Sequence, residues 1–339
     1  MRIILDGMGG DNAPLETVKG AVEASKLMDH EICIVGRENM IMEELAKYSY
    51  DENKIKIVHA EQVIENEDSP VKAVKRKPES SMVKGITMVK EGHGDLFVSA
   101  GNTGALVVSG RMILGRIKGI DRPALASVYP VLGSKACLLV DAGASSEAKP
   151  HNLLEYGTMG SIYVEKVFGR DNPKVGLVNL GVEPSKGTTV TKEAYKQLSQ
   201  APINFIGNVE AREVPSGACD VIVCDGFVGN VILKLTEGLA WNILKLLKKK
   251  FLEGIKAKVG ALMLKDKMKS VKAEFDYSEY GGAPILGVCG PIIKMHGSSN
   301  AKAVRNTILK GIPFAEENVV EIIKNSISEL EEIIASEEQ

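Results

Sequence analysis

The sequence has little net charge, few aromatic residues and no long apolar segment. Its 339 residues carry a formal net charge of −2, which gives no general signal for binding nucleic acid. Aromatic residues make up 5% of the chain, too few for a base-stacking surface. No segment approaches the roughly 18 apolar residues of a membrane span, and the apolar run before Asp6 is too short for a signal peptide. These absences predict a globular chain in the cytoplasm.

Cofactor and metal motifs are missing as well. The 5 cysteines include no Cys-x-x-Cys pair, which is typical of reduced, buried thiols in a cytosolic protein. The chain contains no His-Glu-x-x-His, no Gly-x-Ser-x-Gly and no P-loop, and the stretch after the first apolar run reads GMGGDN instead of Gly-x-Gly-x-x-Gly. We therefore expect no metal and no cofactor.

Short β-branched runs alternate with longer amphipathic ones along the chain. The predicted strands are residues 2–5, 32–35, 54–58, 95–99, 124–131, 137–140, 174–179, 204–207 and 220–224. The predicted helices are residues 14–28, 38–47, 79–90, 104–114, 153–168 and 191–200, and Pro14, Pro70 and Pro313 are placed near helix starts. This rhythm predicts one α/β domain over residues 1–339, in which a mostly parallel sheet lies between two layers of helices.

One region breaks the alternation. From Val231 to Val259 apolar residues recur every four positions, a stripe too long for a helix that lies on one sheet. Gly254 and Gly260 predict a bend. Residues 239–275 are therefore interpreted as a helical hairpin that projects from the domain and packs against a second copy.

The charge of this predicted arm differs from that of the whole chain. Between residues 245 and 272 it has ten lysines and only two acidic residues. An apolar tip between lysines suits an anionic membrane surface or an acidic partner, with roughly 1 kcal/mol from each lysine near anionic lipid. The candidate contact residues are Lys258, Val259, Leu262, Met263 and Lys265. The alternative is a solvated lysine face combined with a dimer seam.

Seven glycine-rich turns form the second unusual feature. They read LDGMGGDNAP, SAGNTGAL, VDAGASS, NLGVEPSKGT, CDGFVGN, YGGAPILG and MHGSSNAKAV. In an open parallel sheet the ligand site lies outside the carboxyl ends of the strands, so the first five turns are expected at a single rim. Glycine lets the backbone approach a ligand closely, and helix N-termini offer free N–H donors. The pattern predicts a site for phosphate or another oxyanion.

Seven motifs point to one family. MGGDNAP, SAGNTGAL, RPALA, FIGNVEAREV, CDGFVGNVILK, YGGAPILG and HGSSNAKAV occur in this order between residue 1 and about residue 309. Together they resemble the bacterial phosphate acyltransferases of phospholipid synthesis, the PlsX family. The resemblance implies a three-layer α/β/α Rossmann-like fold related to the phosphotransacetylases and isopropylmalate dehydrogenases.

The resemblance also implies an activity and partners. A homodimer would transfer a fatty acyl group from acyl carrier protein to inorganic phosphate, and the acyl phosphate would feed a membrane glycerol-3-phosphate acyltransferase. Such a protein is expected in the cytoplasm and peripherally at the membrane, and the tip of the arm could contact acyl carrier protein as well as lipid.

This reaction depends mainly on the positioning of phosphate and of hydrogen-bond donors around the thioester. Phosphate is anionic near neutral pH and the thiolate leaving group has a pKa of about 8.5, so positioned donors that stabilise the oxyanion suffice. Asp225 and Lys186 are the predicted catalytic residues: Asp225 orients phosphate or accepts its proton, and Lys186 supplies a cation. The alternatives are that Asp225 caps the turn after its strand and that Lys186 is a solvated loop residue.

The other candidates are predicted to bind phosphate or the oxyanion. They are Asn12, Gly101, Asn102, Thr103, Arg122, Gly229, Asn230, His296, Ser298 and Ser299. Plainer alternatives stay open for several of them. Asn102, Thr103 and Ser299 could cap helices, His296 could be structural, and Arg122 could form a surface pair.

Two other functions stay open. One is a short-chain phosphate acetyltransferase that uses coenzyme A, and the other is a non-catalytic membrane scaffold. The lysine-rich arm favours an acidic protein donor or a lipid surface over a soluble metabolite alone. The glycine-rich turns at strand ends argue against a scaffold, which would not need them.

Overall fold

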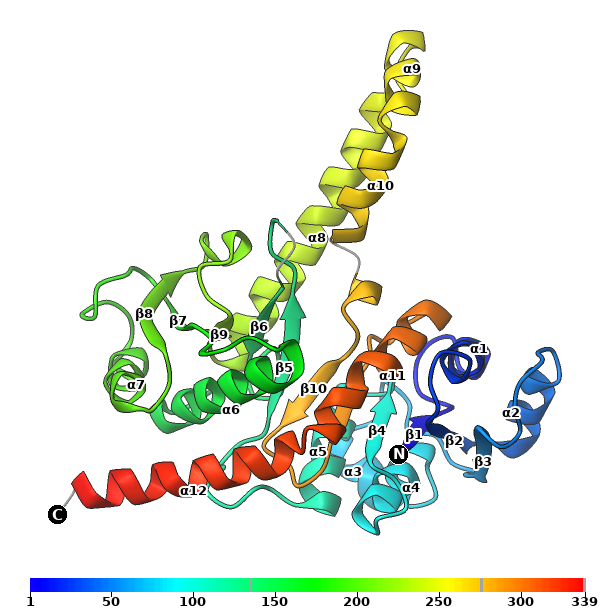
Figure 1. Cartoon of the computed structure of the whole chain (residues 1–339), viewed down its shortest axis with the longest axis horizontal. Helices are drawn as coiled ribbons and strands as arrows, with labels where there is room; N and C mark the ends of the chain where they lie inside the picture. The colour runs from blue at the N-terminus through cyan, green and yellow to red at the C-terminus, as the bar shows by residue number, and fades with distance from the viewer. Residues whose placement is uncertain (134–135, 275–276, 338–339) are drawn as a thin grey trace.

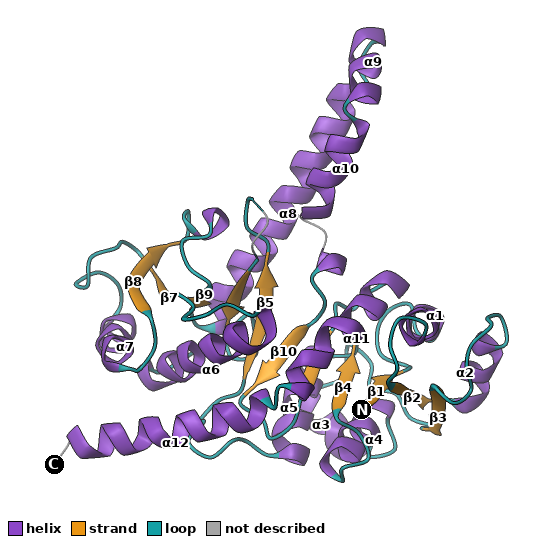
Figure 2. Ribbon diagram, in the orientation of Figure 1, coloured by secondary structure: helices purple, strands orange, loops and turns teal. Residues whose placement is uncertain are grey.

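An 11-stranded sheet with helices on both faces runs through the molecule (Figures 1 and 2). The computed structural model describes residues 1–133, 136–274 and 277–337. The strand order is β3-β2-β1-β4-β11-β10-β5-β6-β9-β7-β8. The predicted α/β fold with a mostly parallel sheet between helical layers is confirmed.

The strands are short, and most of their residues are buried. They are β1 (Arg2–Asp6), β2 (Glu31–Gly36), β3 (Ile55–His59), β4 (Leu96–Ser99), β5 (Ala124–Tyr129), β6 (Cys137–Val140), β7 (Val175–Asn179), β8 (Phe205–Glu210), β9 (Val221–Val223), β10 (Ala283–Leu286) and β11 (Ile292–Lys294). The helices are α1 (Leu15–Ser25), α2 (Glu38–Leu45), α3 (Pro70–Arg76), α4 (Ser81–Lys90), α5 (Thr103–Ser109), α6 (Pro150–Phe168), α7 (Thr189–Gln200), α8 (Gly226–Phe251), α9 (Ile255–Met263), α10 (Lys265–Glu274), α11 (Ala301–Glu316) and α12 (Val319–Glu337). A π-helical turn, Gly110–Leu114, continues α5.

The two halves of the sheet point in opposite directions. Strands β1 to β4 and β11 are parallel, and so are β6 to β9. Between them β10 pairs antiparallel with β11 and β5, and β5 pairs antiparallel with β6. The turns after β4, β6 and β9 nevertheless meet, since Thr103, Gly143 and Asn230 line one cavity, described below. Of the five turns predicted at one rim, these three contribute to that cavity, and the turns after β1 and β7 are not part of its lining.

The centre of the sheet comes from β10 and β11, which the sequence did not predict. Each has only three or four residues and follows a Gly-rich or Pro-containing turn. Strand β10 pairs with β5 at two positions, Ile285 with Leu125 and Leu286 with Ala124. Beyond Leu125, β5 and β10 form no further pair, which leaves a gap in the ladder between the two halves of the sheet.

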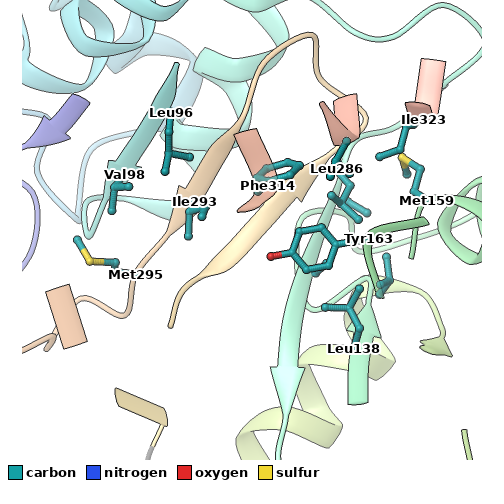
Figure 3. Close-up of a cluster of buried hydrophobic side chains, with 14 of the residues drawn as sticks. Leu96, Val98, Leu138, Met159, Tyr163, Leu286, Ile293, Met295, Phe314 and Ile323 are labelled. Atoms are coloured by element: carbon teal, nitrogen blue, oxygen red, sulfur yellow. The ribbon is translucent and has the colours of Figure 1, made fainter. Parts of the chain in front are cut away.

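Side chains that alternate along the strands form a separate hydrophobic core on each face of the sheet. Along β4, Leu96 and Val98 join the cluster under α6 and α11, while Phe97 joins the cluster on the other face. Figure 3 shows Phe314 of α11 and Tyr163 of α6 within the first cluster. Their ring centroids lie 5.4 Å apart in an edge-to-face arrangement, worth about 0.5–1.5 kcal/mol beyond the buried area.

Helices α8, α9 and α10 form a projecting arm (Figure 1). Helix α8 leaves the sheet, α9 lies at the tip, and α10 returns beside α8. Between α8 and α9, Gly254 has φ +86°, a backbone conformation that glycine adopts without strain. None of the helices, over the residues described, is long and apolar enough to cross a bilayer.

Two predicted helix starts differ in the structure. Pro313 lies inside α11, so its placement near a helix start is wrong. That helix begins after Asn300, whose side-chain Oδ1 accepts a hydrogen bond from Ala303 N at 3.0 Å. Ser299 is therefore not the cap. Pro70 is at the first position of α3, as predicted, and Ser69 before it makes no capping hydrogen bond.

Candidate active site

A cavity of about 390 Å³ lies between β5, the first part of α8, the start of α5 and the end of β11. The segment Tyr280–Ala283, which leads from the arm into β10, closes another side. The volume lies within the range of small-molecule sites. The walls therefore come from both halves of the sheet, next to the gap between β5 and β10.

Lys294 brings a buried positive charge to this cavity. It is the last residue of β11, is 8% exposed and lines the cavity. Its Nζ donates to Ala100 O at 3.3 Å and to Met295 O. Burial lowers the pKa of Lys294 to about 8, although the nearby carboxylate of Asp6 acts in the opposite direction. The side chain is therefore mostly cationic at neutral pH and is suited to an anionic ligand.

One face of α8 forms the opposite wall. Asn230, Lys234 and Glu237 are spaced by four and three residues, so they lie on the same side of the helix. Lys234 Nζ lies 2.8 Å from Glu237 Oε2. The hydroxyl of Tyr129 at the end of β5 lies 2.8 Å from Thr236 Oγ1, which ties the helix to the sheet. This wall supplies one cation, one carboxylate and one amide.

His296 follows Lys294 by two residues and also lines the cavity. Burial, together with the positive charge of Lys234, lowers the pKa of its imidazole below the usual 6.5. Ser298 N donates to Nδ1 at 3.3 Å, and Ser298 Oγ lies 2.8 Å from the same atom. The neutral ring therefore carries its proton on Nε2.

The start of α8 packs against the turn that follows β6. Asp225 caps the helix, since its Oδ1 accepts from Val228 N at 2.9 Å. Gly229 is buried, and a Cβ at this position would lie 1.9 Å from the backbone oxygen of Asp141. The bare backbone in CDGFVGN therefore permits close helix–strand packing. Neither Asp225 nor Gly229 is among the residues that line the cavity.

The residues of the turn after β4 have different roles. Asn102 caps α5 by accepting from Ala105 N at 2.9 Å, and its Nδ2 donates to the carbonyl oxygens of Glu65, Asn66 and Asp68. Its side chain is thus engaged in holding the loop 65–68. Gly101 N donates to Ser99 Oγ at 3.0 Å. Thr103, the next residue, lines the cavity.

The structure brings Thr103, Asn230 and His296 together in the cavity, with Ser298 bonded to His296. It leaves the nine other predicted residues outside the cavity lining. Lys186 is exposed in the loop before α7, Arg122 donates to Glu147 O at 2.6 Å, Asn12 is exposed, and Asp225 caps α8. Ser299 is buried and its N donates to His296 O at 3.0 Å.

Sequence reasoning missed Lys294 and Lys234. A lysine directly after the apolar pair of PIIK was a usable signal, but the strand around it was too short to be predicted. Lys234 lies one helical turn after Asn230. Once Asn230 was a candidate, the spacing of four residues placed Lys234 on the same face.

The tip of the arm is apolar and exposed. Val259, Leu262 and Met263 are 56%, 73% and 82% exposed, and Lys258 and Lys265 beside them are exposed as well. Along α8 a second exposed stripe contains Val231, Leu235, Leu239 and Ile243. As for metals, no cluster of three or more His, Cys, Asp or Glu with a suitable arrangement occurs in residues 1–133, 136–274 and 277–337.

Comparisons with known proteins identify the family. A family model described as "Fatty acid synthesis protein" matches residues 1–322. The phosphate acyltransferase of Alkaliphilus oremlandii is 55% identical over 97% of this chain and 98% of its own length. The phosphate acyltransferase of Clostridioides difficile is 49% identical over 98% of both chains.

Solved structures share the fold. A phosphotransacetylase from Streptococcus pyogenes superposes with a TM-score of 0.64 at 16% identity and covers 94% of each chain. A branched-chain phosphotransacylase from Enterococcus faecalis gives a TM-score of 0.56 at 14% identity, over 92% of this chain and 98% of its own. At such identities the likeness concerns the fold alone.

The fold and the relatives together define an acyl-transfer enzyme. The chain belongs to the fatty acid synthesis protein family, in which its relatives carry the name phosphate acyltransferase. The family assignment made from the sequence motifs is confirmed.

Proposed function

We propose that the cavity transfers a fatty acyl group from acyl carrier protein to inorganic phosphate. The observation that carries the proposal is the buried cation of Lys294, placed beside His296 and Thr103 in a chain whose relatives are named phosphate acyltransferase. A phosphate dianion in a low-dielectric site needs such a partner, because an unpaired buried charge is costly.

The residues divide the work as follows. Lys294 binds phosphate, and the hydroxyl of Thr103 and the amide of Asn230 orient it. A phosphate oxygen attacks the thioester carbon, and His296 Nε2–H donates to the carbonyl oxygen as it becomes an oxyanion. The carbon–sulfur bond then breaks and the thiolate leaves.

Asp225 acts in this proposal through the helix that it caps, since α8 carries Asn230 and Lys234. It is a positioning residue and not a base in contact with phosphate. Lys186 lies in the exposed loop before α7 and is the alternative cation. A direct comparison of the two lysines by mutation decides between them, as set out in the Discussion.

The arm supports a protein donor. Acyl carrier proteins are acidic, and residues 245–272 hold ten lysines against two acidic residues. We propose that the exposed α8 stripe pairs with a second copy and that the tip touches an anionic membrane surface, near the glycerol-3-phosphate acyltransferase that consumes the product.

A trapping assay tests the function. The purified chain is mixed with hexadecanoyl-acyl carrier protein and phosphate, and acyl phosphate is captured with hydroxylamine. Acyl hydroxamate that requires both phosphate and the carrier-protein donor supports the proposal. Product with acetyl-coenzyme A alone indicates a short-chain phosphate acetyltransferase instead. No product from any donor, with vesicle binding intact, indicates a scaffold.

A further inference from the structure

A second cavity, of about 450 Å³, lies on the other face of the sheet. Its walls are largely apolar side chains of α6 and α11, among them Tyr163, Val167, Phe168, Leu309 and Pro313. Side chains of β5 alternate between the two faces of the sheet, so the strand lies between the two cavities. Leu125 and Tyr129 belong to the core on the side of the first cavity, whereas Val128 packs into the core under α6 and α11. The function proposed above makes no use of this second cavity.

The two cavities meet at three shared lining residues, Val128, Tyr280 and Gly282. These residues lie where β5 and β10 no longer pair, just beyond the pairs that join Leu125 to Ile285 and Ala124 to Leu286. Gly281 and Gly282 bring no side chains to this point. The cavity that holds Lys294 and the apolar cavity on the other face therefore adjoin at the gap between β5 and β10.

The two charged side chains that line the second cavity are engaged elsewhere. Arg170 Nη1 lies 2.8 Å from Asp220 Oδ1, and its Nη2 donates to Ala136 O at 2.7 Å. Lys310 Nζ donates to Glu279 O and lies 6.0 Å from the ring centroid of Tyr280. What these groups leave toward the cavity is mainly hydrocarbon, so an apolar occupant fits it.

We propose that the second cavity holds the hydrocarbon chain of the acyl group, with the thioester in the first cavity and the chain passing between β5 and β10. The inference rests on the proposed function, and it names the part of the substrate that the first cavity leaves unaccounted for. Each methylene removed from water favours binding by a factor of about four. An apolar compartment joined to the reaction compartment therefore makes long acyl chains better donors than short ones.

Filling the second cavity tests this assignment. Val167→Phe on α6 and Leu309→Phe on α11 enlarge two partly buried side chains that line it from different helices. The values of kcat/KM are measured with butyryl-, decanoyl- and hexadecanoyl-acyl carrier protein. We expect both variants to lose on the order of tenfold with the hexadecanoyl donor and to stay within about twofold of the native chain with the butyryl donor.

Ile162→Phe is the matched control, since Ile162 is a partly buried residue of α6 that does not line the cavity. It should leave the ratio between long and short donors unchanged. Unaltered ratios in Val167→Phe and Leu309→Phe, with acyl phosphate still formed, would overturn the assignment of the cavity and leave the proposed function standing.

A binding measurement keeps the inference testable if no donor gives acyl phosphate, an outcome that would contradict the proposed function itself. A photoreactive diazirine analogue of hexadecanoic acid is cross-linked to the native chain, and the labelled peptides are identified by mass spectrometry. Labels on residues 163–170 or 309–313 support the assignment. Labels confined to the arm or other surfaces contradict it.

Discussion

Lys294 combines near-complete burial with a positive charge, two properties that seldom occur in one side chain. Its Nζ reaches the carbonyl oxygens of Ala100 and Met295, so the hydrogen bonds of the ammonium are partly satisfied while its charge is not paired in those contacts. Burial lowers its pKa to about 8. A site that keeps such a cation gains by binding an anion, because the anion restores the electrostatic stabilisation lost with water.

Replacing Lys294 should therefore affect phosphate more than the acyl donor. We expect Lys294→Met to lower kcat/KM for phosphate by about 10²-fold or more, the usual loss for one preorganised electrostatic group. Steady-state kinetics with varied phosphate measures it. Lys186→Met is the matched control, an exposed lysine outside the cavity lining. A large loss in Lys186→Met with little change in Lys294→Met would reverse the assignment of the cation.

The same residue sets an expected pH dependence. Because burial lowers the pKa of Lys294 to about 8, the side chain is cationic below that pH and loses its charge as the pH rises through it. At limiting phosphate the rate should fall above about pH 8. The control is Lys294→Arg, which stays charged: its activity, even if lower, should not show this fall. An equal fall in both chains would assign the titration to another group.

At the scale of the element, the start of α8 shows glycine used for packing. A Cβ on Gly229 would lie 1.9 Å from Asp141 O, whereas a Cβ on Gly238, farther along the same helix, would meet nothing within 4 Å. The Asp141 carboxylate accepts hydrogen bonds from the backbone N–H groups of Leu125, Gly143, Ala144 and Ser145, so this strand end cannot easily move away.

Two glycine substitutions in one helix should therefore have opposite effects. Gly229→Ala is expected to lower the free energy of unfolding by roughly 3 kcal/mol through overpacking. Gly238→Ala should raise it by about 1 kcal/mol, because alanine is the better helix former. Urea unfolding followed by circular dichroism measures both. A neutral Gly229→Ala would show that the contact with Asp141 relaxes at little cost.

Sequence periodicity predicted α6, α7 and most of the buried strands, since these depend on local patterns, but the predicted helices did not include α11 or α12. It could not predict β10 and β11, whose three or four residues acquire strand structure only between β4 and β5. The turns after β4, β6 and β9 were expected at one ligand site, and Thr103, Gly143 and Asn230 do line one cavity. Lys294 was missed because it lies on β11 itself, which was not predicted.

At the scale of the whole molecule, the arm offers two exposed apolar surfaces. The stripe on α8 includes Leu239, which is 57% exposed, and the tip includes Leu262, which is 73% exposed. Isolated apolar residues are common on protein surfaces, but a stripe along one helix and an apolar tip between lysines fit two different partners. The proposed assignments are a second copy for the stripe and a lipid surface for the tip.

A pair of reciprocal variants separates these assignments. Leu262→Glu should weaken sedimentation with anionic vesicles while the chain stays dimeric and active toward soluble donors. Leu239→Glu should shift the oligomeric state toward monomer in analytical ultracentrifugation. If Leu262→Glu leaves vesicle binding unchanged, the tip is not the membrane contact. If Leu239→Glu leaves the native oligomeric state unchanged, the stripe is not the dimer seam.

The two bases of the arm are also walls of the first cavity. Helix α8 contributes Asn230 and Lys234 on the way out, and the returning chain contributes Tyr280–Gly282 before entering β10. Helix α8 follows β9 in one half of the sheet. The segment Tyr280–Gly282 leads into β10, which together with β11 joins the two halves. The same two segments therefore carry the arm and line the cavity, so the direction of the arm and the shape of the cavity depend on each other.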